Sequence, residues 1–201
     1  MLSFRKKISQ SVKMSLYAVI CFPHLLIFLF HKKNKIIKAD VRRWLDVYGK
    51  NYSTYKGFVF LLSFYPEFRN LFYHRIGFLS NFLNIFCRKM STLFITTYEI
   101  GEGLFIQHGF ATVIAARSIG KNCWINQQVT IGFSNKDDCP VIGDNVTINA
   151  GAKVIGGVVI GSNSVVGANA VVVKNVPENS VVVGVPAYII KRNGIKVKES
   201  L

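Results

Sequence analysis

The sequence IGDNVTINAGAKVIGGVVIGSNSVVGANAVV, residues 142–172 of this 201-residue chain, carries the strongest fold signal. An Ile or Val recurs there at every sixth position, a period that fits neither a helix, which repeats every 3.6 residues, nor an alternating strand. Six residues make one short strand and one turn, so three repeats close a triangular coil that must stack on a neighbouring coil. The recurring residues are Ile142, Ile148, Val154, Ile160, Val166 and Val172.

Three repeats per coil place every eighteenth residue above its predecessor. We therefore expect stacking of Ile142 on Ile160, Ile148 on Val166 and Val154 on Val172. Gly, Asn and Asp gather at the expected corners, where a positive φ is tolerated. A β-sandwich would show alternation and irregular strand spacing instead. The pattern predicts a parallel β-helix of about four coils.

The same step continues upstream but breaks twice. One extra residue lies between Ile106 and Val113, and an eleven-residue interval separates Ile131 from Ile142, which predicts an inserted loop. The upstream positions in step are Ile100, Ile106, Val113, Ile119, Ile125 and Ile131.

The first half of the chain differs in charge and composition. Residues 1–90 carry sixteen Lys or Arg and three acids, a net charge of +13, whereas residues 91–201 carry nine and seven, a net charge of +2. A basic half favours an anionic partner such as lipid headgroups, nucleic acid or a polyphosphate. Half of all residues are hydrophobic and the mean hydropathy is +0.32, which excludes a disordered chain.

Helical periodicity marks this first half. Lys38–Tyr48 has apolar residues at offsets of three and four, and Pro66–Met90 predicts one or two helices with Gly77 as the break. The fold class expected is mainly β, with a β-helix preceded by a smaller α-helical domain. We expect a basic, aromatic-rich helical domain over residues 1–95, the β-helix over 96–192, and a C-terminal tail over 193–201.

The apolar run Leu16–Phe30 has Lys13 before it and three lysines within residues 32–35. It lacks the cleavage site of a signal peptide. It is also too short for a spanning helix and contains Pro23 and His24. A buried helix and an interfacial helix held on anionic lipid both remain open. Either way we expect a cytoplasmic protein, in the second case with a peripheral contact at the inner face of the membrane.

Four cysteines, Cys21, Cys87, Cys123 and Cys139, show no CxxC spacing. We expect all four to be free thiols in a reducing compartment.

Several stretches resemble one family, the hexapeptide-repeat acyltransferases, and within it the serine acetyltransferase branch. They are GEGLFIQHG (101–109), INQQVTIG (125–132), IGDNVTINAGAKVIG (142–156), VVGANAVVVKNVP (165–177) and VVGVPAYII (182–190), with FYHRIG (72–77) ahead of the coils. The resemblance covers residues 65–192. It implies a left-handed β-helix, acetyl-CoA as co-substrate, transfer to a hydroxyl acceptor and a homotrimer.

Moving an acetyl group from a thioester to an alcohol requires a base for the hydroxyl proton, and a neutral His suits that task near pH 7. His108 is the one His of four that lies in the coil half, beside the first register break. The family match at Gln107–Gly109 implies that His108 is this base, with direct transfer and no acyl-enzyme. We expect backbone N–H groups at a coil corner to stabilise the oxyanion.

Two departures from serine acetyltransferases matter. That branch has Asp before the catalytic His, where this chain has Gln107, so we expect Glu102 or Glu99 to orient His108.

The branch also has an Arg-His pair before a Pro in its long loop, where this chain has Asp138–Cys139 before Pro140. Asp137 and Asp138 would repel an amino-acid carboxylate. We therefore expect a saccharide of surface polysaccharide as the acceptor, with serine O-acetyltransferase of cysteine biosynthesis as the alternative. The saccharide expectation rests on association with similar family members.

The resemblance also implies the cofactor contacts. Ala150 and Ala168 stand where small side chains admit the pantetheine arm, and Lys174 and Lys191 stand where basic groups meet the nucleotide phosphates. Tyr188 replaces an Arg common in relatives, so Lys191 and Arg192 would carry more of that contact. Solvated surface is the competing interpretation of these lysines.

Three other functions fit less well. A zinc enzyme of the γ-carbonic anhydrase type needs three His ligands, so we expect no metal. A purely structural β-helix, the second alternative, would show regular Thr ladders, which are absent from the sequence. A nucleic-acid binder would show a base-reading motif, so we expect no nucleic-acid partner.

Overall fold

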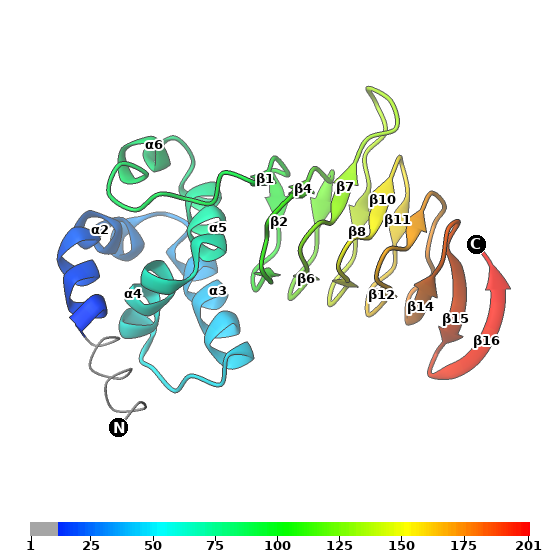
Figure 1. Ribbon diagram of the computed structural model, residues 1–201, viewed down its shortest axis with the longest axis horizontal. Helices are drawn as coiled ribbons and strands as arrows, with labels where there is room; N and C mark the ends of the chain where they lie inside the picture. The colour runs from blue at the N-terminus through cyan, green and yellow to red at the C-terminus, as the bar shows by residue number, and fades with distance from the viewer. Residues whose placement is uncertain (1–11) are drawn as a thin grey trace. The chain divides into compact units, whose positions relative to one another are not determined.

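The structure, a computed structural model, describes residues 12–201 (Figure 1). The chain divides after Met90 into two compact units, each described here by itself. The boundary expected after residue 95 differs by five residues from this division, because Leu93–Ile95 already forms strand β1 of the second unit.

The second unit is a left-handed parallel β-helix of five coils, and the expected fold class is confirmed. Short strands form three faces. Face A holds β1 (Leu93–Ile95), β4 (Thr112–Ile114), β7 (Thr130–Gly132), β10 (Lys153–Ile155) and β13 (Val171–Val172). Face B holds β2 (Glu99–Ile100), β5 (Ser118–Ile119), β8 (Val141–Ile142) and β11 (Val159–Ile160). Face C holds β3 (Phe105–Ile106), β6 (Trp124–Ile125), β9 (Thr147–Ile148), β12 (Val165–Val166) and β14 (Ser180–Val183).

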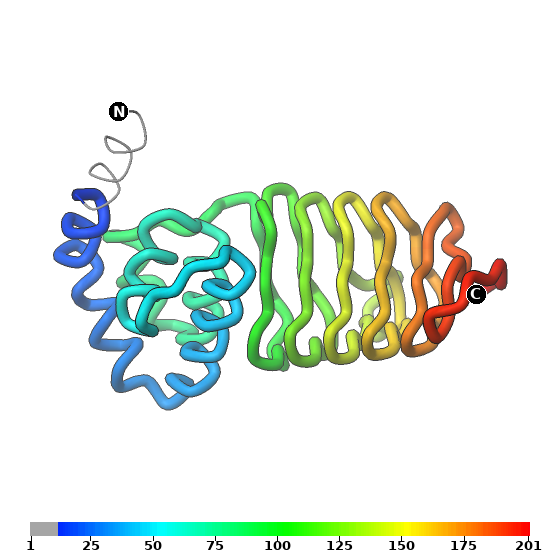
Figure 2. Tube along the Cα trace, turned by 90° about the horizontal axis from the view of Figure 1, so that it is seen from below, coloured from blue at the N-terminus to red at the C-terminus, as the bar shows by residue number. Residues whose placement is uncertain are grey.

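Figure 2 shows how these coils stack one on the next. All three expected stacking pairs are confirmed: Ile142 with Ile160, Ile148 with Val166, and Val154 with Val172. The recurring aliphatic side chains are buried in the interior, with one exception. The expectation at Val113 is wrong: Val113 is exposed, and Ile114 is buried in its place and pairs with Ile131. The β-helix has one coil more than expected because the first coil begins at β1, upstream of the earliest repeat position seen in the sequence.

Three edges join the faces. The His108 edge joins face C to face A through residues 107–111, 126–129, 149–152 and 167–170. The loop edge joins face A to face B through residues 96–98, 115–117, 133–140, 156–158 and 173–175. The asparagine edge joins face B to face C and carries positive-φ residues in every coil, namely Gly103, Asn122, Asn145, Asn163 and Asn179. Two of its side-chain contacts run between coils, from Asn145 to Asn163 and from Asn163 to Asn179.

The C-terminal segment continues the sheet beyond the coils. Strand β15 (Tyr188–Arg192) pairs antiparallel with β14, and β16 (Ile195–Ser200) pairs antiparallel with β15. Residues 193–201, expected as a tail, therefore contain a strand of face C.

The first unit is helical. After a helix over Val12–Ile20 come α2 (Phe22–Phe30), α3 (Asn34–Val47), α4 (Thr54–Phe64), α5 (Pro66–Ile76), η1 (Gly77–Leu79) and α6 (Ser80–Leu83). The helix expected at Lys38–Tyr48 lies in α3. The break expected at Gly77 is present, because Gly77 ends α5 with φ 66°.

Aromatic rings fill the core of this unit. Phe28 stacks on Phe58 with ring centroids 4.2 Å apart, and Trp44 packs edge-on against Phe68 at 5.3 Å. One buried ion pair joins two helices: Nε of Arg75 in α5 lies 3.0 Å from Oδ2 of Asp40 in α3.

The apolar run Leu16–Phe30 is divided between core and surface. Cys21, His24 and Phe28 are buried, whereas Val19 and Phe30 are exposed. No single helix within residues 12–201 is long and apolar enough to cross a membrane; Val12–Ile20 and Phe22–Phe30, bent by 67°, pass a test of length and composition only as a pair.

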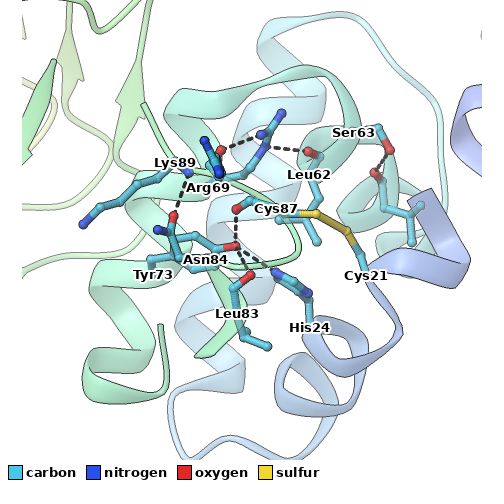
Figure 3. Close-up of a disulfide and its surroundings, with 12 residues drawn as sticks. Cys21, His24, Leu62, Ser63, Arg69, Tyr73, Leu83, Asn84, Cys87 and Lys89 are labelled. Atoms are coloured by element: carbon cyan, nitrogen blue, oxygen red, sulfur yellow. Dashed lines mark hydrogen bonds between the residues drawn. A yellow bond between two sulfur atoms is a disulfide. The ribbon is translucent and has the colours of Figure 1, made fainter. Parts of the chain in front are cut away.

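The expectation of four free thiols is wrong for two of them. Cys21 and Cys87 are joined as a disulfide, while Cys123 and Cys139 are free (Figure 3). Sixty-six residues separate the bonded pair, so no local spacing signals it. The fold brings the break before α2 beside the segment that follows α6.

Candidate functional site

His108 lies in the one irregular corner of its edge. The corner 107–111 has five residues, whereas each later corner of the His108 edge has four. The first register break lies at this corner, and the next inward residue, Ile114, follows Ile106 by eight residues instead of six. The regular coil geometry is therefore interrupted where the candidate base is placed.

The backbone of this corner is also unusual. His108, Gly109 and Ala111 have φ of 64°, 54° and 51°, whereas each later corner of the edge has one residue with positive φ. Non-glycine residues rarely adopt this region, and such strain clusters at functional sites. The His108 side chain is exposed, and its ring has no hydrogen bond to any residue in 12–201. The imidazole is thus open to a substrate.

Gln107, where the resemblance implies an Asp, is held by the next coil. Its Oε1 accepts a hydrogen bond from Nε1 of Trp124 at 3.2 Å. The same indole donates to Oδ1 of Asn126 at 3.2 Å, and Nδ2 of Asn126 donates to Oδ1 of Asn149 at 3.2 Å. This polar ladder fixes the residue before His108. Sequence reasoning missed Trp124 and the two asparagines, although Gln107, Asn126 and Asn149 all directly follow a face C strand.

The structure places Glu102 and Glu99 away from that ladder. Glu102 lies on the asparagine edge, at the opposite end of β3 from His108, and its Oε1 lies 3.3 Å from Nζ of Lys121. Glu99 begins β2 on face B. Neither makes a hydrogen bond or ion pair with His108 in the described part of the chain. A role for Glu102 in orienting His108 stays a prediction.

The inserted loop, residues 133–140, replaces a three-residue corner on the loop edge and projects from the coils between β7 and β8 (Figure 1). Asp138 organises it. Its Oδ1 accepts the backbone N–H groups of Ser134 at 2.7 Å and Asn135 at 3.1 Å, and its Oδ2 accepts the Ser134 hydroxyl. These bonds, the hydroxyl foremost, lower the pKa of the Asp138 carboxyl. Asp137, by contrast, is exposed.

The two free thiols do not suit a nucleophile. Burial raises the pKa of the Cys123 thiol to about 11, and burial also raises the pKa of Cys139. Neither sulfur is a thiolate at neutral pH, and the thiolate is the reactive form. This fits direct transfer better than an acyl-enzyme.

The expected pantetheine contacts share an edge with His108. Ala150 and Ala168 lie in the corners 149–152 and 167–170, stacked on successive coils, and the N–H of Asn169 donates to the carbonyl of Ala150 at 2.9 Å. Ala168 is exposed and Ala150 half-buried. The edge thus offers backbone and small side chains in line with the imidazole.

The expected phosphate contacts are separated. Lys174 lines a pocket of about 550 Å³ at the last coil together with Tyr188 and Lys198, while Lys191 does not line it. Lys198 was missed because the tail showed no repeat. Glu199 also lines this pocket, and its carboxylate pairs with Arg192 at 3.1 Å.

Comparison with known proteins agrees with this geometry. A family model described as bacterial transferase hexapeptide (six repeats) matches residues 139–174. A serine acetyltransferase of Synechococcus elongatus is 36% identical over 177 residues, 81% of this chain and 71% of that protein. One from Staphylococcus aureus (strain Mu50) is 48% identical over 103 residues, 49% of this chain and 48% of that protein. The chain thus spans about half the length of the S. aureus relatives.

Solved structures give the same result. The serine acetyltransferase of Neisseria gonorrhoeae has a TM-score of 0.65 at 29% identity, covering 83% of this chain and 70% of that one. The enzyme of Brucella abortus strain S19 has a TM-score of 0.66 at 26% identity, covering 86% and 74%. With its coils, its corner His and a relative matched over most of both lengths, the chain belongs to the serine acetyltransferase branch of the hexapeptide-repeat acyltransferases.

Proposed function

We propose that this protein is an acetyl-CoA-dependent O-acetyltransferase in which His108 is the general base. The acceptor oxygen attacks the thioester carbonyl as its proton passes to the imidazole; the C–O bond forms, the C–S bond breaks, and the proton passes on to the CoA sulfur. The observation that carries this proposal is the exposed His108 in the strained five-residue corner, on the edge that also presents Ala150 and Ala168. Base catalysis of this kind supplies about 10²–10⁴-fold in rate.

The relatives support acetyl-CoA as the donor, since they are named serine acetyltransferases. A solved serine acetyltransferase that shares this fold is a complex with CoA. We propose that the pantetheine arm follows the His108 edge and that the nucleotide phosphates meet Lys174 and Lys198. This donor requires no metal in the step at His108.

L-serine is the acceptor that the comparisons favour. The matched proteins are serine acetyltransferases, and a solved structure of the N. gonorrhoeae enzyme is a complex with serine. One observation favours a saccharide hydroxyl as the second candidate: the loop 133–140 carries the acids Asp137 and Asp138 and neither Arg nor His. Both carboxylates would repel that of an amino acid, since the hydrogen bonds to Asp138 favour its ionised form. Asp137 is exposed and is the acid that can be replaced without removing those bonds.

The two acceptors are separated by measuring CoA release from acetyl-CoA with L-serine, nucleotide sugars and polysaccharide repeat units in parallel. Release with L-serine and formation of O-acetylserine supports the first candidate. Release only with saccharides supports the second. An Asp137→Arg variant refines the test, because it should improve the KM for serine while leaving the KM for a neutral sugar unchanged. No release with any hydroxyl acceptor would refute the transferase proposal.

We further propose that the protein works as a homotrimer. His108 and the loop 133–140 lie on different edges of one prism, so the loop of one copy can reach the imidazole of another only if copies pack side by side. Light scattering coupled to gel filtration should give three chains per particle. Mixed particles built from His108→Ala chains and loop-deleted chains should regain part of the activity if neighbouring copies complete each site.

The helical unit carries a surface that suits anionic lipid, and we propose a cytoplasmic protein that contacts the inner face of the membrane there. Its first two helices and the η1–α6 segment expose apolar side chains, and lysines flank the run. The exposed apolar residues are Leu16, Val19, Phe22, Leu26, Phe30, Phe78, Phe82, Ile85 and Phe86. Apolar side chains beside basic ones are typical of interfacial helices.

Flotation with vesicles tests this contact. Binding to phosphatidylserine vesicles, weaker with neutral vesicles and at high salt, supports the proposal. Val19→Glu combined with Phe30→Glu should abolish it while Lys50→Glu, outside the apolar run, should have little effect. The proposal would be contradicted if the protein did not float and copies of the chain associated with one another through their helical units.

A further inference from the structure

The helical unit buries three metal-ligating side chains that acetyl transfer does not use. Cys21 lies at the break before α2, His24 lies in the first turn of α2, and Cys87 follows α6 (Figure 3). Both sulfur atoms and one ring nitrogen of His24 lie within 4.8 Å of one another. Their side chains are buried, with His24 fully excluded from solvent. Two segments distant in the sequence therefore converge on one small cluster.

Hydrogen bonds define the state of the His24 ring. Nε2 lies 2.8 Å from the hydroxyl of Tyr73, and that hydroxyl donates to the carbonyl oxygen of Cys87 at 2.5 Å, with Leu83 as a second acceptor at 3.2 Å. A hydroxyl has one proton, so its oxygen accepts from Nε2–H of the ring. This network assigns the proton to Nε2 and leaves a lone pair on Nδ1.

The lone pair on Nδ1 accepts no hydrogen bond within the described part of the chain. Nδ1 is buried and has no hydrogen-bond partner among residues 12–201. Buried polar atoms without partners are rare in native structures and require an explanation. A metal ligand supplies one, because a ligating His characteristically donates its other ring N–H to a neighbouring oxygen, as His24 does to Tyr73.

The donor set identifies the class of ion. Two thiolates and a neutral imidazole are the ligands of thiophilic ions, among which Zn²⁺ is bound by Cys and His with no redox chemistry of its own. Two thiolates and one Zn²⁺ sum to zero charge, and a buried site with no net charge avoids the cost of burying an unpaired ion.

We propose that, when Cys21 and Cys87 are reduced, the helical unit binds one Zn²⁺ through their two thiolates and Nδ1 of His24. Binding releases one proton from each thiol and transfers no electrons. A phosphine reduces the disulfide by supplying two electrons; water supplies the two thiol protons and the oxygen of the phosphine oxide that forms. The same two segments are then linked by the disulfide in one state and by the ion in the other.

The test uses the full chain, reduced with a phosphine under anaerobic conditions, loaded with Zn²⁺ and desalted. We expect one tightly bound zinc per chain by elemental analysis. Co²⁺ in place of Zn²⁺ should give the intense near-ultraviolet absorption of thiolate bound to cobalt. The Cys123→Ser and Cys139→Ser variants, which change the two free thiols, should bind as the wild type does.

Ligand variants locate the site. Cys21→Ser, Cys87→Ser and His24→Gln should each lose the bound zinc, and Tyr73→Phe should weaken binding by about 10–100-fold because it removes only the partner of Nε2. If a ligand variant fails to fold, the cobalt spectrum of the wild type still decides. Zinc retained by Cys21→Ser with Cys87→Ser, cobalt bound without sulfur absorption, or no zinc on the reduced wild type would each overturn the proposal. None of these readouts depends on acetyl transfer.

Discussion

The indole Nε1 of Trp124 donates to Oε1 of Gln107 across two successive coils, at 3.2 Å. Gln107 directly precedes His108, so this bond ties the backbone that carries the candidate base to the coil beneath it. The Asp that the resemblance implies at this position would act on the imidazole through its charge. An amide has no charge to offer, and here it serves as the upper end of a neutral hydrogen-bonded ladder.

Replacing His108 by Ala should lower the turnover of acetyl transfer by about 10²–10⁴-fold, because no other group accepts the hydroxyl proton. The KM for acetyl-CoA should change little, since the imidazole acts on the acceptor. Gln128→Ala is the matched control, because Gln128 also has a positive φ at a corner of this edge but bears no base. Steady-state kinetics of the two variants and the wild type measure both kcat and the KM for acetyl-CoA. Wild-type turnover in His108→Ala would remove His108 from the reaction.

The hydrogen bond between Trp124 and Gln107 should affect turnover, because it positions His108. Gln107→Leu keeps the size of the side chain and removes its acceptor, while Trp124→Phe removes the donor. A neutral hydrogen bond contributes about 0.5–1.5 kcal/mol, so a double-mutant cycle on kcat should show a coupling of about that size. The KM for acetyl-CoA should stay constant. Purely additive effects on kcat would show that the ladder has no role in positioning His108.

Charge at the last coil should govern the affinity for acetyl-CoA. Lys174→Glu and Lys198→Glu should each raise the KM several-fold, about 1 kcal/mol, and the effect should shrink at high salt. Lys196→Glu is the control, because Lys196 lies on the same strand as Lys198 but does not line the pocket.

Lys191→Glu distinguishes two predicted phosphate contacts: Lys191, which the resemblance implies, and the pocket lined by Lys174, which the structure shows. A raised KM supports the contact implied by resemblance, and an unchanged value supports the pocket at Lys174. If all four lysine variants had the wild-type KM for acetyl-CoA, the nucleotide would have to bind elsewhere.

Most of the β-helix could be predicted from the sequence because each coil repeats the same local pattern. The Ile or Val at every sixth position specifies both burial and register, so the pairs Ile142 with Ile160 and Ile148 with Val166 followed without three-dimensional information. The first register break likewise marked the corner of His108. The first coil was missed because Ile95, the β1 residue paired with Ile114, lies five residues before Ile100 and so falls outside the six-residue step.

Contacts between different positions of the coil were not readable. Glu102 pairs with Lys121 because both lie on the asparagine edge. Which residues fall on an edge depends on how many residues are inserted in the preceding coils. The Cys21–Cys87 disulfide depends on how helices pack, for which 66 intervening residues carry no local signal. Lys198 joins Lys174 only because the last segment turns back as a strand.

In the helical unit, Asp40→Ala should destabilise the fold strongly. Asp40 and Arg75 are both buried, and removal of one partner leaves a buried charge without its counter-ion. Breaking such a pair costs about 3–5 kcal/mol in the free energy of unfolding. Asp46→Ala, an exposed change on the same helix, should stay within about 0.5 kcal/mol of the wild type. Urea denaturation followed by circular dichroism measures both, and equal midpoints would contradict the role given to the pair.

The carboxylate of Asp138 should hold the loop 133–140 in its observed shape. Its pKa is lowered, chiefly by the Ser134 hydroxyl, so the ionised form is favoured in the folded loop. The stabilisation is therefore present above the ordinary carboxyl pKa of about 3.9 and is lost as the pH falls through the lowered value. Amide resonances of Ser134 and Asn135 should shift in that acidic range.

At neutral pH, Asp138→Ala should reproduce this loosening by removing the acceptor of four hydrogen bonds within the loop. Trypsin should then cut after Lys136 markedly faster than in the wild type, because a disordered loop enters a protease site more readily. Asp137→Ala is the control, since the Asp137 carboxylate bonds to none of residues 12–201 and its loss should leave the cutting rate unchanged. If Asp137→Ala and Asp138→Ala were cut equally fast, sequence next to Lys136, rather than the hydrogen bonds of Asp138, would explain the cleavage.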